Sequence, residues 1–157
     1  MNWTEFINAI LKVIKKILER KQEEPKIELL TMPSSDVQGE ISLAGLRLLY
    51  PGLLDSKYCY TRAEDWAEIF SYIYFVFDMP KYLVDRMDCD DFAVLLKGLV
   101  TSFFGLNCFG VVYGNTPMGY HSWNVFRTEE TWLQFEPQTG EFFKMNKRDY
   151  KPEWILI

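Results

Sequence analysis

Three residues that could carry out nucleophilic chemistry occur in a fixed order in the second half of the chain. Cys89 opens an apolar segment, His121 is the only histidine of the protein, and Glu136 directly precedes a proline. A thiol, an imidazole and a carboxylate in that order are the parts of a nucleophilic triad. In such a triad the imidazole takes the proton of the thiol, and the carboxylate orients the imidazole. The three residues are therefore candidates for one catalytic site.

The immediate neighbours of Cys89 work against a reactive thiol. Asp88, Asp90 and Asp91 flank it, and their negative charges favour the neutral thiol over the nucleophilic thiolate. The start of a helix favours the thiolate, and protonated His121 or a bound cation would favour it further. Without such help, we expect Cys89 to be a small, buried hydrophobic residue at the start of a helix. Most free cysteines are buried in this way.

His121 and Glu136 fall on two successive segments that read as antiparallel strands. A carboxylate on a neighbouring strand can accept the Nδ1–H of an imidazole and thereby fix its tautomer. Taken alone, a glutamate at the end of a strand is more typically an ordinary exposed acid. Asn124 and Asp149 are alternative residues for orienting the imidazole.

The elements that must position these residues are helices first and strands second. Apolar side chains at steps of three and four residues predict helices over 1–24, 41–49, 61–77 and 89–104. Thr61 and Glu64 have the spacing of a capping box, and Gly105 is a typical C-terminal cap. Short aromatic and β-branched segments then predict strands over 108–113, 120–127, 132–136 and 141–145. Helices followed by an antiparallel sheet define an α+β domain.

Composition narrows the class of protein. The chain has 157 residues, 48% of them hydrophobic, which suits one domain over 25–157 preceded by the amphipathic segment 1–24. Its net charge of -5 disfavours a nucleic-acid partner. Three irregularly spaced cysteines and one histidine form no zinc pattern, and they predict reduced thiols and a cytoplasmic location. The cationic face of the N-terminal segment would suit a membrane surface, a partner protein or its own domain.

From Asp88 to Gly140 the sequence resembles the transglutaminase-like superfamily of cysteine enzymes. The resemblance rests on the acid-flanked Cys89, on His121 with the four residues after it, and on 132–140, which contains Glu136-Pro137. It implies a papain/transglutaminase-like core, in which a central helix carrying the cysteine packs on a C-terminal antiparallel sheet. It also implies Cys89 as nucleophile, His121 as base and acid, and Glu136 where the family usually has aspartate.

The resemblance implies a cysteine-dependent hydrolase, of protease or amidase type, or an acyl transferase. Either enzyme would act on amide bonds of a peptide or protein substrate through a thioester and would require no cofactor. A bacterial branch of the family holds calcium near its nucleophile, and Asp88, Asp90 and Asp91 are similar to that cluster. Helix capping explains the same aspartates without a metal. The alternative function is a catalytically inactive domain of this type that serves as a binding or assembly module.

Overall fold

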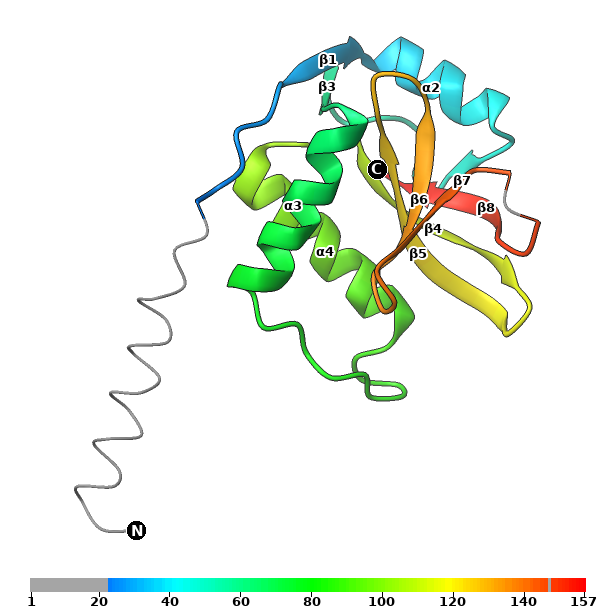
Figure 1. Cartoon of the computed structure of the whole chain (residues 1–157). Helices are drawn as coiled ribbons and strands as arrows, with labels where there is room; N and C mark the ends of the chain where they lie inside the picture. Colours follow the sequence, from blue (N-terminus) through cyan, green and yellow to red (C-terminus); the bar gives the residue numbers. More distant parts are fainter. Residues whose placement is uncertain (1–22, 147) are drawn as a thin grey trace, which may run out of the picture.

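A six-stranded mixed sheet forms the centre of the molecule, and helices pack around it (Figure 1). The computed structural model describes residues 23–146 and 148–157. The amphipathic helix expected over 1–24 lies almost wholly outside the described residues, so this helix and the domain boundary at residue 25 stay predictions. None of the described helices combines the length and the hydropathy that a transmembrane span needs.

The large sheet combines strands from both halves of the chain. Five neighbouring strands of this sheet pair antiparallel, and β2 pairs in parallel with β8 at one edge. Across the sheet the strands are β2 (Arg47–Leu48), β8 (Lys151–Leu156), β4 (Phe109–Thr116), β5 (Gly119–Arg127), β6 (Trp132–Glu136) and β7 (Glu141–Lys144). β4 and β5 form a long hairpin at the centre, which places His121 opposite Gly114.

A smaller unit lies beside the large sheet. β1 (Leu30–Pro33) pairs antiparallel with β3 (Lys57–Tyr60), and α2 (Ser34–Leu43) follows β1 directly. The sequence predicted a helix over 41–49, whereas the helix ends at Leu43 and residues 47–48 form a strand. That prediction was wrong because a strand of two residues is too short to show a period of two.

α4 (Cys89–Phe104) is the helix that the sequence predicted, with the same bounds. At its start Asp88 and Asp91 form a reciprocal capping box, and at its end Gly105 adopts the left-handed conformation with φ of 66°. Its buried face includes Ala93 and Leu96 and packs on β4 and β5. The helix therefore holds Cys89 at the edge of the central hairpin.

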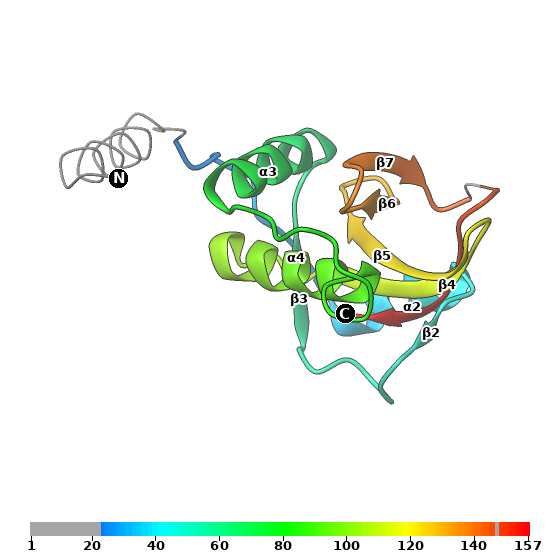
Figure 2. The same cartoon turned by 90° about the horizontal axis from the view of Figure 1, so that it is seen from below.

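α3 (Ala63–Val76) packs against α4 on the same side of the sheet (Figure 2). The capping box predicted for Thr61 and Glu64 is wrong. The Thr61 hydroxyl instead lies within hydrogen-bond distance of the Asp65 carboxylate and the Glu28 carbonyl, and thereby ties the helix start to the segment before β1. Burial of Thr61 explains the change, because a buried hydroxyl must find a partner.

Two hydrophobic clusters make up the core. One lies between α3, α4 and the sheet, and its centre is a stack of aromatic rings in which Phe70 and Phe135 are 4.1 Å apart. The other lies between α2 and the opposite side of the sheet, and it contains Val37, Trp123 and Ile155. The central strands are thus buried on both faces, and β5 is buried from Ser122 to Arg127.

The predicted arrangement of N-terminal helices on a C-terminal antiparallel sheet is wrong. The sheet is mixed, and the N-terminal half supplies β1, β2 and β3 as well as helices. The strands over 109–144 were found from sequence, but β8 was missed. Pro152 lies inside β8, and a proline argues against a strand when only the sequence is read.

Candidate functional site

His121 and Glu136 are joined directly. His121 lies near the start of β5, Glu136 ends β6, and the imidazole Nε2 lies 2.7 Å from Glu136 Oε2. The side chain of His121 is 14% exposed and that of Glu136 is 3% exposed, so water screens the pair little. The pairing is the one considered from sequence, but the ring nitrogen is Nε2 where Nδ1 was expected. Asn124, an alternative partner, donates instead to the carbonyls of Ala93 and Gly110.

Aromatic rings hold the imidazole from the other directions. The ring of Trp123 stacks near His121 with centroids 5.8 Å apart, and Tyr150 meets both rings edge-on. The indole N–H of Trp123 donates to Gln134 Oε1 at 2.6 Å. Because Trp123 and Gln134 are buried, this bond fixes the ring on which His121 rests.

Cys89, at the start of α4, lies beside Ser122, which follows His121 on β5. The backbone N–H of Ser122 is directed at the sulfur and favours the thiolate, but this effect does not prevail. Burial raises the pKa of the Cys89 thiol, and the nearby charges of Asp88 and Asp90 raise it further. The thiol is therefore neutral at physiological pH, as the flanking aspartates suggested.

The three aspartates around Cys89 are mostly occupied in holding the helix start. Asp88 and Asp91 form the capping box, in which the Asp88 N–H donates to Asp91 Oδ2 at 3.2 Å. A hydrogen bond between the side chains of Asp88 and Asp90 lowers the pKa of Asp88 and raises that of Asp90. One ligand atom each from Asp88, Cys89 and Asp90 lies within 4.8 Å of the others. Calcium at Asp88, Asp90 and Asp91 stays a prediction.

An aromatic pocket lies beside this helix start. It has a volume of about 620 Å³ and is lined by Leu49, Tyr113, Tyr120 and Trp154. Burial raises the pKa of Tyr113, and the charges of Asp90 and Cys89 add to this effect, which places the phenol close to both. Sequence reasoning missed this pocket because its residues come from three strands and a loop.

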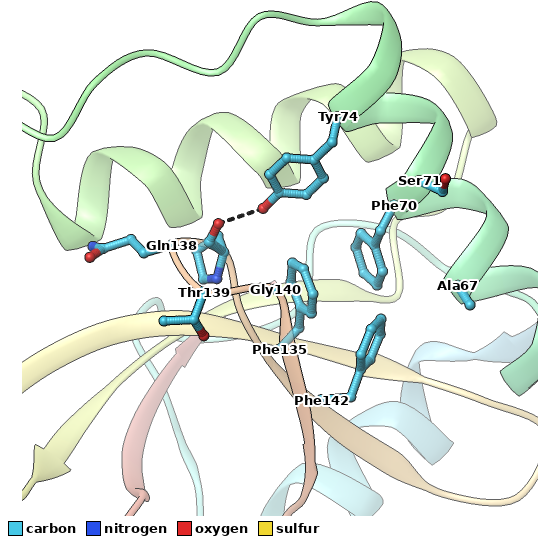
Figure 3. Close-up of a pocket in the computed structure, with 10 residues that line it drawn as sticks. Ala67, Phe70, Ser71, Tyr74, Phe135, Gln138, Thr139, Gly140 and Phe142 are labelled. Atoms are coloured by element: carbon cyan, nitrogen blue, oxygen red, sulfur yellow. Dashed lines mark hydrogen bonds between the residues drawn. The ribbon is translucent and has the colours of Figure 1, made fainter. Parts of the chain in front are cut away.

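A second pocket lies between α3 and the β6–β7 hairpin (Figure 3). It has a volume of about 350 Å³, and Phe70, Phe135 and Phe142 form its aromatic wall. At one end the Tyr74 hydroxyl donates to the Pro137 carbonyl at 2.6 Å. Pro137 follows Glu136 in the chain, so this pocket borders the His121–Glu136 pair.

Comparison with known proteins finds solved structures with a similar fold, but it identifies no family. No family model and no curated protein matches the chain. Two similar solved structures are a PSL1a–E64 complex, with a TM-score of 0.63 and 24% identity, and the Polyporus squamosus lectin, with a TM-score of 0.64 and 23% identity. The lectin is bound to the human-type influenza-binding epitope Neu5Aca2-6Galb1-4GlcNAc. Each match covers 82% of this chain and 50% of the other, so this chain corresponds to about half of those proteins.

These comparisons contradict the resemblance to the transglutaminase-like superfamily. The matching solved structures include a lectin, so the papain/transglutaminase-like core, the cysteine hydrolase or acyl transferase, and the peptide substrate were wrong. The physical reason lies in the short motifs on which the resemblance rested. An acid-flanked cysteine at a helix start also satisfies the needs of a helix cap, and α4 uses its aspartates in this way.

Two expectations, one about a cofactor and one about location, have different outcomes. The expectation that no cofactor is required is consistent with the two matching structures. The cytoplasmic location stays a prediction. Cys89, His121 and Glu136 remain candidate site residues, and the function that they serve is a separate question.

Proposed function

We propose that this domain is a carbohydrate-binding module. Its site is the aromatic pocket of Leu49, Tyr113, Tyr120 and Trp154, with Asp90 and Cys89 close to the Tyr113 phenol. The observation that carries the proposal is this combination of aromatic rings with the polar groups of Asp90 and Cys89 beside Tyr113. Ligand pockets commonly pair apolar walls with a few polar groups that fix the orientation of the ligand.

The chemistry of the pocket suits a sugar. Aromatic faces pack against the C–H faces of pyranose rings, and phenolic hydroxyls remain available for hydrogen bonds. Asp90, near Tyr113, offers carboxylate oxygens as acceptors for sugar hydroxyls. Arg47 lies over the ring of Trp154 at 5.3 Å and would supply a positive charge near an acidic sugar.

The state of the thiol favours reversible binding over covalent chemistry. The pKa of Cys89 is raised, first by burial, and a neutral thiol is a weak nucleophile. His121 directs Nε2 at Glu136 and is thereby held in one orientation, as a ligand contact requires. The bound epitope of the structurally similar lectin supports the ligand class. That lectin chain is twice as long as the matching region, so the ligand must be tested on this chain itself.

The test is calorimetry with the trisaccharide Neu5Aca2-6Galb1-4GlcNAc on the full chain and on two variants. Trp154→Ala should weaken binding by roughly tenfold, since one aromatic contact contributes on the order of 1 kcal/mol. Phe103→Ala is the matched control, because Phe103 is an exposed aromatic residue near the opposite end of α4. If both variants bound the trisaccharide with equal affinity, the aromatic pocket would not be the binding site.

A parallel experiment uses E64, the compound present in the other matching structure. Intact mass after incubation with E64 reports whether the compound becomes covalently attached to the chain. We expect no adduct on Cys89 within hours at neutral pH. A rapid adduct that Cys89→Ala abolishes would contradict a purely binding role and would identify a nucleophilic thiol.

A further inference from the structure

The turn Pro137–Gly140 connects the second pocket to the candidate site. The Tyr74 hydroxyl of α3 donates to the Pro137 carbonyl at 2.6 Å, and Figure 3 marks this bond by a dashed line from Tyr74. A cavity of about 350 Å³ lies between this helix and the turn. This pocket is open to solvent, and the hydrogen bond links α3 to the turn at one end of it.

The same turn fixes the carboxylate that holds His121. The Gln138 N–H donates to Glu136 Oε1 at 3.2 Å, and the Gly140 N–H donates to the Glu136 carbonyl at 2.8 Å. With Oε1 held in this way, Oε2 is the oxygen that meets the imidazole at 2.7 Å. A shift of the turn would thus move the carboxylate relative to the ring.

The phenol of Tyr74 is suited to a constant role as donor. Burial raises its pKa, and the nearby charge of Glu136 raises it further, so the hydroxyl keeps its proton over the whole physiological range. Its partner Pro137 is buried, and the ring of Tyr74 lies edge-on to Phe135. The bond is consequently shielded from competing water.

We propose that Tyr74 is a positioning residue for His121. Its hydroxyl holds the turn, the turn holds Glu136, and Glu136 holds the imidazole. The link to the imidazole is independent of any ligand, and only its effect on ligand affinity rests on the proposed function.

Several groups besides Glu136 surround the imidazole and define its environment. Tyr150 lies edge-on to the ring, and the charges of Glu136 and Glu141 contribute to the raised pKa of Tyr150. Cys89 approaches from α4 at the neighbouring Ser122. A change at Tyr74 alters none of these groups, so an effect on His121 would indicate that the turn has moved.

The test compares Tyr74→Phe with Tyr72→Phe in the full chain. Both variants remove one oxygen from α3, but Tyr72 packs on Phe103 and Phe104, away from the turn. Because the protein has a single histidine, nitrogen-15 NMR observes the Nε2 proton of His121 without ambiguity. Tyr74→Phe should speed the exchange of this proton with water roughly fivefold, the factor expected for one weakened hydrogen bond. Tyr72→Phe should leave it unchanged.

Two results would overturn the proposal. One is equal proton exchange in Tyr74→Phe and the native chain, with the amide spectrum showing both folded. The other is the same acceleration in both variants, which would indicate general loosening of α3. Trisaccharide affinity is measured separately. If Tyr74→Phe changes proton exchange while neither protein binds the trisaccharide, the positioning role stands and the proposed ligand falls.

Discussion

The Nε2 atom of His121 and the Oε2 atom of Glu136 lie 2.7 Å apart on neighbouring strands, although 15 residues separate them in the chain. The β5–β6 hairpin brings the two residues together, and the turn after β6 holds the carboxylate in place. The pair is nearly buried, yet the imidazole keeps some contact with solvent. It is therefore the part of the candidate site with the best-defined geometry.

Replacement of Glu136 by glutamine should weaken the site and the fold together. The charge that pairs with the imidazole is lost, and we expect the free energy of unfolding to fall by about 1–3 kcal/mol. Glu141→Gln is the control, since Glu141 lies opposite Glu136 in the β6–β7 register but is exposed. Urea unfolding followed by tryptophan fluorescence measures both. Equal stability of Glu136→Gln and the native chain would show that the pair contributes little.

Glu40 should make folding sensitive to acid. It accepts hydrogen bonds from Arg127 and from the Trp132 indole, at 2.8 and 2.7 Å. Burial alone would raise the pKa of Glu40, but these bonds outweigh burial, and the pKa is lowered. A lowered pKa contributes stability above the unfolded-state value near 4.5, and this stability is lost as pH falls. In Glu40→Gln, the loss of stability below about pH 5 should be less steep.

The control for Glu40 is Glu64→Gln, because Glu64 is exposed at the start of α3. Unfolding midpoints in urea, measured from neutral to acidic pH, give the comparison. A native-like pH profile in Glu40→Gln would contradict the role assigned to the Arg127 network.

Lys97 should give stability that rises with pH in the alkaline range. Burial lowers the pKa of Lys97 from 10.5 to about 8, and its ammonium donates to the Phe109 carbonyl at 2.6 Å. Between these two pKa values the unfolded chain binds more protons, so the contribution of Lys97 increases as pH rises. Lys97→Met should remove this increase, while Lys144→Met, at an exposed position, should retain it. If the stability of the native chain and that of Lys97→Met changed with pH in the same way, the prediction would be contradicted.

Cys89 should be alkylated slowly. Its pKa is raised, first by burial and then by Asp88 and Asp90, so iodoacetamide at pH 8 should modify it no faster than a free thiol in a peptide. Asp90→Asn should increase the rate, because one repelling charge is removed. Cys108 should react even more slowly, since burial raises its pKa to about 12. Peptide mass mapping separates the three cysteines, and a Cys89 rate far above the others would indicate activation.

Local signals in the sequence predicted some elements well. The apolar period of α4 and the left-handed glycine at its end gave correct bounds for that helix. The alternation and turn residues of 108–145 located the strands that carry His121 and Glu136. These features depend on neighbouring residues, which a sequence displays directly.

Other features depend on residues that are distant in the chain. β2 is defined only by its pairing with β8, more than a hundred residues later. The aromatic pocket joins Leu49, Tyr113 and Trp154, which show no common spacing. The choice of Nε2 over Nδ1 follows from the strand register and the turn after β6, neither of which the sequence specifies in detail.

The most direct test of the account maps ligand binding on the isotope-labelled full chain. The trisaccharide Neu5Aca2-6Galb1-4GlcNAc is added, and amide shifts are followed by NMR. Binding at the proposed site predicts shifts that saturate and that cluster at Tyr113, Tyr120 and Trp154, with a smaller change at His121. An unchanged spectrum at millimolar trisaccharide, or shifts confined to another surface, would contradict carbohydrate binding at this site.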